Sequence, residues 1–162
     1  MNSNPLESQN SQQQIIKLVV FPVGSLTVAF SIQSVQKVIN YTQVYGSGLS
    51  HIGVAHLEDR EITVIDLHKR LFNRSQPIES EKKAYLILAK NSLGEQFGII
   101  VNQTPALLDI SLSSIRILPE SYRRADTLEI ASHVTVIPQE TGTQTIFILD
   151  SDRLLPIYSP KS

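Results

Sequence analysis

The sequence contains no cysteine and no tryptophan among its 162 residues. The absence of cysteine excludes disulfide bonds, thiolate metal ligands and cysteine nucleophiles, and it is typical of a cytoplasmic protein. The formal net charge is −1, so we expect no general attraction to nucleic acid or anionic lipid. No apolar run approaches the ~18 residues that a membrane-spanning helix needs, and the N-terminus shows no signal-peptide pattern.

Sequence patterns typical of catalysis are also scarce. There is no GxSxG nucleophile motif, no HExxH zinc motif and no glycine-rich phosphate loop. Aromatic residues make up only 6% of the chain, too few for a face that stacks single-stranded nucleic acid. Three of the four histidines, His51, His56 and His68, lie close together, but their spacing does not match a zinc site. We therefore predict no cofactor, no metal and no enzymatic activity.

The chain instead consists of short apolar runs separated by turn-like segments. Residues 1–14 are mostly Asn, Ser and Gln, which predicts a disordered polar tail. Many short strands with frequent turns predict an all-β barrel or sandwich. Four hairpins are expected, at residues 15–21 with 26–32, 53–57 with 62–67, 84–89 with 96–101, and 130–137 with 143–149.

Two aspartates follow apolar strands and open short helical segments. Asp66 begins DLHKRLF and Asp150 begins DSDRLLP, and an aspartate in this position caps the first turn of a helix. Asp66 could instead be a catalytic carboxylate of a small β-barrel enzyme. Because Asp150 repeats the arrangement, we favour the structural role for both.

The two halves of the chain resemble each other. Residues 28–39 align with residues 97–108, and each half ends in a hairpin, an Asp cap and a short helix. We predict one domain over residues 15–158, with lobes at about 15–72 and 84–155 and a polar linker at 73–83. The aligned pairs are Ala29 with Gly98, Gln33 with Asn102, and Val38-Ile39 with Leu107-Leu108.

The central stretch GVAHLEDREITVIDLHKRLF resembles the signature of the CheW family, the adaptors of bacterial chemosensory arrays. Segments AFSIQSVQKVI, FGIIVNQTPALLDISLSSIRILPE and DSDRLL resemble other family segments, so the similarity extends from about residue 15 to 155. The positions that match the central signature without a gap are Gly53, Val54, Leu57, Val64, Ile65, Asp66, Leu67 and Arg70.

The resemblance implies a fold and a function. The fold is two similar five-stranded β-barrel lobes around a shared core. The function is that of a non-catalytic cytoplasmic adaptor, which couples methyl-accepting chemoreceptors to a CheA-type histidine kinase in chemotaxis or a related motility pathway. The resemblance places the receptor tip in the groove between the lobes and docks the regulatory domain of the kinase lobe against lobe. No nucleic acid and no direct membrane insertion are implied.

Two charges depart from the family pattern. Glu58 stands where the family has arginine, and Lys37 stands where it has an acidic residue. On neighbouring strands this reversed pair could still attract, contributing only ~0.2–1 kcal/mol at an exposed site. Its larger effect would be on partner choice. Drift of two surface charges is an equal alternative. Pro105 is also unusual, and it predicts an edge or bulge because proline cannot donate a ladder hydrogen bond.

These features define a set of candidate contact residues for protein partners. Val35 and Leu107 can equally be core residues. A divergent protein-binding module that does not bind a kinase is one alternative function. A module that binds a small ligand between the lobes is another, although the sequence shows no convergent polar cluster for it. The candidates are Val35, Lys37, Val38, Leu57, Glu58, Leu107 and Asp109.

Overall fold

A computed structural model describes residues 14–46, 51–75, 83–123 and 128–155. Residues 1–13 of the predicted tail and most of the predicted linker at 73–83 lie outside this range. All four predicted hairpins form. The strands of the described chain are β1 (Ile15–Val23), β2 (Leu26–Ser31), β3 (Val35–Asn40), β4 (Val44–Gly46), β5 (Ile52–Leu57), β6 (Arg60–Ile65), β7 (Tyr85–Lys90), β8 (Gln96–Val101), β9 (Ala106–Ser111), β10 (Ile115–Ile117), β11 (Ala131–Gln139) and β12 (Gly142–Leu149).

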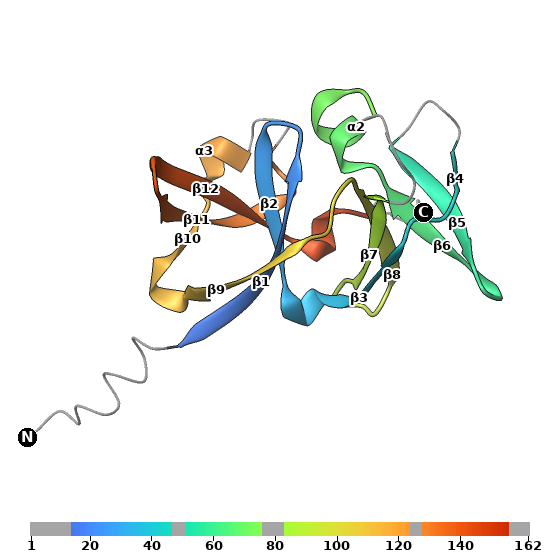
Figure 1. Ribbon diagram of the computed structural model, residues 1–162, viewed down its shortest axis with the longest axis horizontal. Helices are drawn as coiled ribbons and strands as arrows, with labels where there is room; N and C mark the ends of the chain where they lie inside the picture. Colours follow the sequence, from blue (N-terminus) through green and yellow to red (C-terminus); the bar gives the residue numbers. More distant parts are fainter. Residues whose placement is uncertain (1–13, 47–50, 76–82, 124–127, 156–162) are drawn as a thin grey trace, which may run out of the picture.

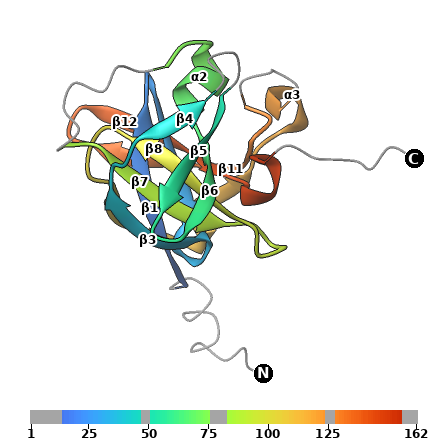
Figure 2. The same cartoon turned by 90° about the vertical axis from the view of Figure 1, so that its right-hand side faces the viewer.

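The strands form two curled sheets that lie next to each other (Figure 1). The first sheet has the order β10-β11-β12-β2-β1-β9, and the second has the order β3-β7-β8-β6-β5-β4; Figure 2 looks onto the second. The two end strands of each sheet are consecutive in the chain: β9 and β10 in the first sheet, and β3 and β4 in the second. One bent segment of chain therefore forms both ends of each sheet. Counted in this way, each sheet is a five-stranded barrel-like lobe, and the predicted all-β class with two similar lobes is confirmed.

Side chains of the two sheets meet in a shared core. The largest buried cluster contains Phe21, Phe30 and Phe97, whose successive ring centroids are 6.0 and 6.2 Å apart. Smaller clusters around Ala29 and Leu88 fill the inside of the first and second sheets. Because side chains alternate along a strand, the central hairpins β1–β2 and β7–β8 contribute to their own sheet's interior and to the shared core.

The predicted lobe boundaries are corrected by the strand order. Strands β1 and β2, from the first half of the chain, lie in the same sheet as β9 to β12. Strands β7 and β8, from the second half, lie in the same sheet as β3 to β6. The two halves have therefore exchanged their first hairpins, and neither sheet corresponds to the predicted lobe of residues 15–72 or 84–155.

The internal repeat itself is confirmed by the strand register. In the parallel ladders, Gly98 lies opposite Val64 and Ala29 lies opposite Ile148. Val64 and Ile148 each precede an Asp cap by two positions. Ala29 and Gly98, which the sequence alignment pairs, therefore occupy equivalent places.

The register of the outer strands agrees with the same alignment. Val38 on β3 lies opposite Ile87, and Leu107 on β9 lies opposite Val19. Ile87 and Val19 are equivalent positions of the two central hairpins. Ile87 directly precedes Leu88, the partner of Gly98, and Val19 directly precedes Val20, the partner of Ala29. Strands β3 and β9 are thus structural counterparts.

Both Asp caps are present. The Asp66 carboxylate accepts from the Lys69 amide at 3.0 Å at the start of α2 (Leu67–Phe72). The Asp150 carboxylate accepts from the Asp152 amide at 2.9 Å at the start of the 3₁₀ turn η4 (Ser151–Arg153). The predicted helix after Asp150 is thus only a single turn within the described residues. The short helix α3 (Glu120–Arg123) and the strands β4 and β10 were not predicted.

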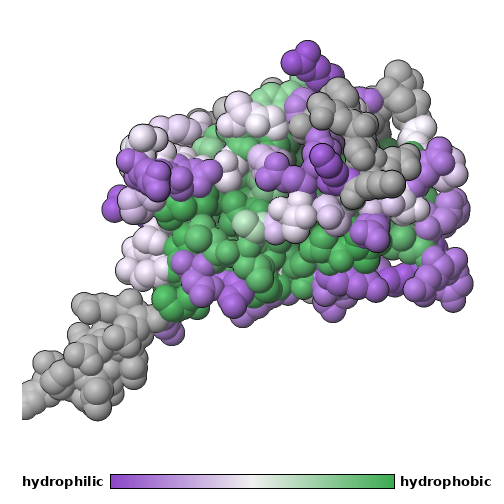
Figure 3. Space-filling view, viewed as in Figure 1, coloured by the Kyte–Doolittle hydropathy of each residue, from purple (hydrophilic) through white to green (hydrophobic). Residues whose placement is uncertain are grey.

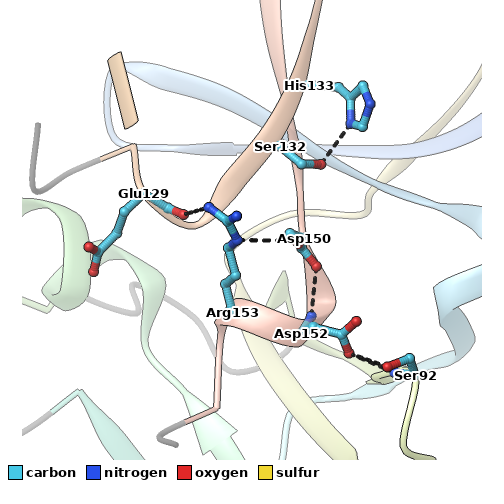
Figure 4. A network of polar contacts seen from close by, with 7 residues as sticks. All are labelled: Ser92, Glu129, Ser132, His133, Asp150, Asp152 and Arg153. Atoms are coloured by element: carbon cyan, nitrogen blue, oxygen red, sulfur yellow. Dashed lines mark hydrogen bonds and ion pairs between the residues drawn. The ribbon is translucent and has the colours of Figure 1, made fainter. Parts of the chain in front are cut away.

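Two turns reach across the seam between the sheets. The β1–β2 turn packs at Gly24 against the ring of Phe72 in α2, which follows the second sheet's β6. The β7–β8 turn places Ser92 against Asp152 of η4, which follows the first sheet's β12 (Figure 4). The Asp152 carboxylate accepts from the Ser92 amide at 2.8 Å and from its hydroxyl at 2.9 Å. In the described part of the chain, no helix is long and apolar enough to cross a membrane.

Candidate functional site

Exposed aliphatic side chains gather where the two sheets meet. Figure 3 shows hydrophobic surface over β9 and β1 that continues toward β3. Single exposed apolar residues are ordinary, but a group of them on adjoining elements is typical of a protein-binding surface. We call this group the seam surface. Its residues are Ile15, Ile32, Val38, Leu107 and Leu112, which are 38% to 62% exposed.

Two short turns hold part of this surface in place. The turns η1 (Ile32–Ser34) and η3 (Leu112–Ser114) each begin after a serine whose side chain accepts from the amide two residues later. Turn η1 packs against both β1 and β3, so it bridges the two sheets. Turn η3 is fastened to the start of β1, since the Leu112 amide donates to the Gln14 carbonyl. Ile32 and Leu112 are thus presented by fixed backbone.

Sequence reasoning did not find Ile32 and Leu112. The pattern that could have identified them is the repeated pair SIQSV at 31–35 and SLSSI at 111–115. In both, a serine caps a single turn and an aliphatic residue follows directly. An aliphatic side chain on the outer side of such a turn does not reach the core and stays exposed.

The predicted contact residues divide between this surface and a second place. Val38 and Leu107 belong to the seam surface, 41% and 62% exposed. Val35 is half-buried and packs against the shared core, which favours the packing role for it. Asp109 is exposed on β9, and its carboxylate lies 3.8 Å from the Lys17 ammonium on β1. The side chains of Lys17 and Asp109 are 47% and 60% exposed, so their attraction contributes little to stability.

Lys37, Leu57 and Glu58 line a separate depression of about 180 Å³ on the second sheet. We call it the charged depression, and His56 and Arg60 also line it. Its floor is aliphatic, and its rim carries both signs of charge. Such a surface suits a partner with an apolar side chain surrounded by charges.

The expectation that Lys37 and Glu58 lie on neighbouring strands is wrong. Strand β3 pairs with β7, whereas β5 pairs with β4 and β6. No ion pair joins Lys37 to Glu58 in the described part of the chain. The curl of the sheet nevertheless brings both residues to the charged depression, so one partner can contact both.

Glu58 also has an unusual backbone. Its φ is 56°, a left-handed conformation that glycine adopts readily and other residues seldom adopt. Glu58 and Asp59 form the turn between β5 and β6, with Leu57 opposite Arg60. The turn therefore places the Glu58 side chain at the rim of the charged depression, although its left-handed backbone conformation is unfavourable for a residue other than glycine.

Pro105 lies between β8 and β9 and not within a strand. The expectation that this segment forms an edge is confirmed by the strand that begins directly after Pro105. Strand β9, which follows it, is the end strand of the first sheet in the hydrogen-bonding order. The proline's missing amide costs no ladder hydrogen bond in that position.

His51, Asp66 and His68 line one cavity beside α2, whereas His56 lines the charged depression. His56 lies 3.7 Å from Glu61 on the surface, while His68 contacts the Arg74 carbonyl through Nδ1. The Asp66 carboxylate is occupied by the amide it caps. This geometry supports the capping role for Asp66. Among the described residues, no group of three or more potential metal ligands lies together.

Comparison with known proteins gives three results. The model of the CheW-like domain family matches residues 17–157. The structure is similar to the crystal structure of the scaffolding protein TtCheW from Thermoanaerobacter tengcongensis, with a TM-score of 0.68 and 22% sequence identity over 85% of each chain. The search of curated proteins gave no match.

Proposed function

Because this chain belongs to the CheW-like domain family, we propose that it is a non-catalytic adaptor that couples chemoreceptors to a CheA-type histidine kinase. Membership of a scaffold family supports the adaptor role, and the finer assignment of partners is our inference. In this proposal the seam surface binds the tip of a receptor, and the charged depression contacts the regulatory domain of the kinase.

The seam surface is the observation that carries the proposal. Five exposed aliphatic side chains lie on β1, β3, β9 and two capped turns. Their backbone is held by sheet and turn hydrogen bonds, so binding would order few new groups. A preorganised apolar surface loses less entropy on association than a mobile one.

A second candidate is a divergent adaptor that does not bind a typical kinase, and the reversed charges favour it. Lys37 and Glu58 present the opposite charge pattern from the family at the same depression. A partner complementary to the family pattern would meet like charges there, and like charges across an interface lower affinity.

The test is calorimetric titration with the regulatory domain of a CheA-type kinase from the same organism. We expect micromolar binding that Lys37→Glu alone weakens. A kinase that recognises the more common charge pattern should bind the double variant Lys37→Glu with Glu58→Lys better than the wild type. Identical binding by all variants would remove the charged depression from the kinase interface.

The seam surface is tested separately with a receptor-tip fragment. We expect Leu107→Ser to weaken binding by about fivefold or more, as for a buried apolar contact. Leu93→Ser is the matched control, because Leu93 is 82% exposed on the β7–β8 turn, outside the seam surface. Equal losses from both variants, or binding to neither partner by the folded wild type, would contradict the adaptor proposal.

A further inference from the structure

An exposed tyrosine lies on an end strand of the second sheet. Tyr45 is the central residue of β4 and is 54% exposed. Of the phenylalanines and tyrosines that the structure describes, only Tyr45 and Tyr122 are more than half exposed. Tyrosine is enriched at the energetic centres of protein interfaces, because its large, rigid ring loses little entropy when a partner covers it. Tyr45 is therefore a candidate contact residue on a backbone that the sheet holds in place.

Tyr45 belongs to a row of three exposed side chains that crosses β4, β5 and β6. The Tyr45 and His56 rings meet edge to face, with their centroids 5.7 Å apart and their planes inclined by 63°. On the next strand, the Glu61 carboxylate lies 3.7 Å from Nδ1 of His56. We call these three residues the tyrosine row. Each ring or carboxylate in it has a neighbour that limits its position.

The strand register explains why these side chains share one face. Tyr45 lies opposite Val54, and His56 lies opposite Glu61. Ala55, between Val54 and His56, is fully buried inside the second sheet, so its two neighbours point to the outer face. Tyr45 and His56 are thus diagonal neighbours on that face, a separation that aromatic side chains can bridge.

His56 also connects the tyrosine row to the charged depression. Its side chain is a member of the row and lines the depression as well. A partner that covers the depression therefore meets His56 directly and Tyr45 one side chain further out. The combined surface has an aliphatic floor, an aromatic ring and charges of both signs, which is the composition of a protein interface with an apolar centre and a polar rim.

We propose that Tyr45 is an anchor residue for the partner that binds the charged depression, and that the tyrosine row forms the outer part of that interface. This inference rests on the proposed function, in which the partner is the regulatory domain of a CheA-type kinase. The row crosses three strands, so it fits the face of a folded domain. The His56 ring limits the motion of the Tyr45 ring before binding, so association costs little side-chain entropy.

The experiment is a calorimetric titration of the full chain and its variants with the kinase regulatory domain. Tyr45→Ala should weaken binding about fivefold to thirtyfold, as expected for an interface anchor. Tyr122→Ala is the matched control, because Tyr122 is 57% exposed on α3, near β11 of the first sheet (Figure 1). It should change the affinity by less than about twofold. Thermal unfolding of both variants should match the wild type, since both side chains are exposed.

The outcomes separate this inference from the proposed function. If the wild type binds and Tyr45→Ala binds as tightly as Tyr122→Ala, the anchor role is overturned and the proposed function stands. If the folded wild type does not bind the kinase domain, both are overturned. Tyr45→Phe keeps the ring and should bind within about threefold of the wild type. A loss as large as that of Tyr45→Ala would overturn the role of the ring.

A double-mutant cycle tests whether the tyrosine row acts as a unit. His56→Ala removes the ring beside Tyr45 as well as a group that lines the charged depression, so it should also weaken binding. Because the two rings are in contact, the double variant should lose less affinity than the product of the two single losses. Single losses that multiply without coupling would overturn the positioning role of His56.

Discussion

The two central hairpins occupy equivalent places, yet their turns are held by different chemistry. The β1–β2 turn meets α2 through the close approach of Gly24 to the Phe72 ring. The β7–β8 turn meets η4 through two hydrogen bonds from Ser92 to Asp152. Both turns cross the seam to the segment that follows the other sheet. The fold thus requires a contact at this place and does not specify whether the contact is apolar or polar.

The turns also differ in how they keep their own shape. Both turns contain a glycine with a positive φ, Gly24 at 58° and Gly94 at 81°. In the β7–β8 turn, the Asn91 side chain accepts from the amides of Leu93 and Glu95 at 3.0 and 2.9 Å. Asn91 is one of the few buried polar residues among those described. The β7–β8 turn is therefore also held by one of its own side chains, whereas the β1–β2 turn packs against the Phe72 ring.

The largest expected effect comes from the core that both hairpins share. Phe30→Ala removes a fully buried ring and should lower the free energy of unfolding by about 3–5 kcal/mol. Ile99→Ala, at the equivalent place on β8, should cost about 2–5 kcal/mol. Chemical denaturation measures both. A loss below about 1 kcal/mol for one of them would show that the two hairpins do not share the core equally.

The next effect separates the apolar turn from its counterpart. Gly24→Ala places a Cβ 2.7 Å from Phe72 Cε2 at a positive φ, whereas Gly94→Ala has a positive φ and no atom within 4 Å. The left-handed backbone costs about 1–2 kcal/mol in either variant. We expect about 1–2 kcal/mol more for Gly24→Ala, because the ring must move. Equal values from thermal unfolding would mean that the Phe72 contact yields without cost.

The two Asp caps should respond alike. Asp66→Ala and Asp150→Ala each remove a carboxylate that accepts a first-turn amide, which costs about 0.5–2 kcal/mol. Asp150 also contacts the Arg153 guanidinium at 3.2 Å (Figure 4), a partly exposed pair that adds little. Denaturation in urea measures the difference. A loss from only one of the two would contradict the equivalence of the caps.

The smallest effect concerns the polar turn. Ser92→Ala removes the hydroxyl donor but keeps the backbone amide that donates to the same Asp152 oxygen. The contact is exposed, so we expect a loss of about 0.5 kcal/mol or less. Asp152→Ala removes the acceptor of both bonds and should cost more. If Ser92→Ala cost as much as Gly24→Ala, the polar contact would be as important as the apolar one.

Local features of the fold could be predicted from the sequence, and long-range pairing could not. Apolar runs on both sides of turn residues gave the four hairpins, and the aspartates gave the two caps. The parallel ladders β6 with β8 and β12 with β2 join segments far apart in the chain, and no local pattern encodes them. The lobe boundaries and the relation of Lys37 to Glu58 were wrong for this reason.

The candidate site shows the same limit. Val38 and Leu107 were predicted because they occupy equivalent positions of the repeat, and the structure exposes both side chains. The three-residue strands β4 and β10 are too short to show a period of two. The charged depression depends on β3, β7 and the β5–β6 hairpin meeting on one surface, which only the folded chain reveals.

The exchange of first hairpins has a consequence for how such a chain could arise. A protein of half this length would contain one hairpin and four further strand segments. Its hairpin would complete a sheet only with the four strand segments of a second copy. Two such copies, each lending its hairpin to the other, form an interlocked homodimer. Joining the end of one copy to the start of the other produces the strand order of this chain. The molecule has the topology of a domain-swapped dimer fused into one polypeptide.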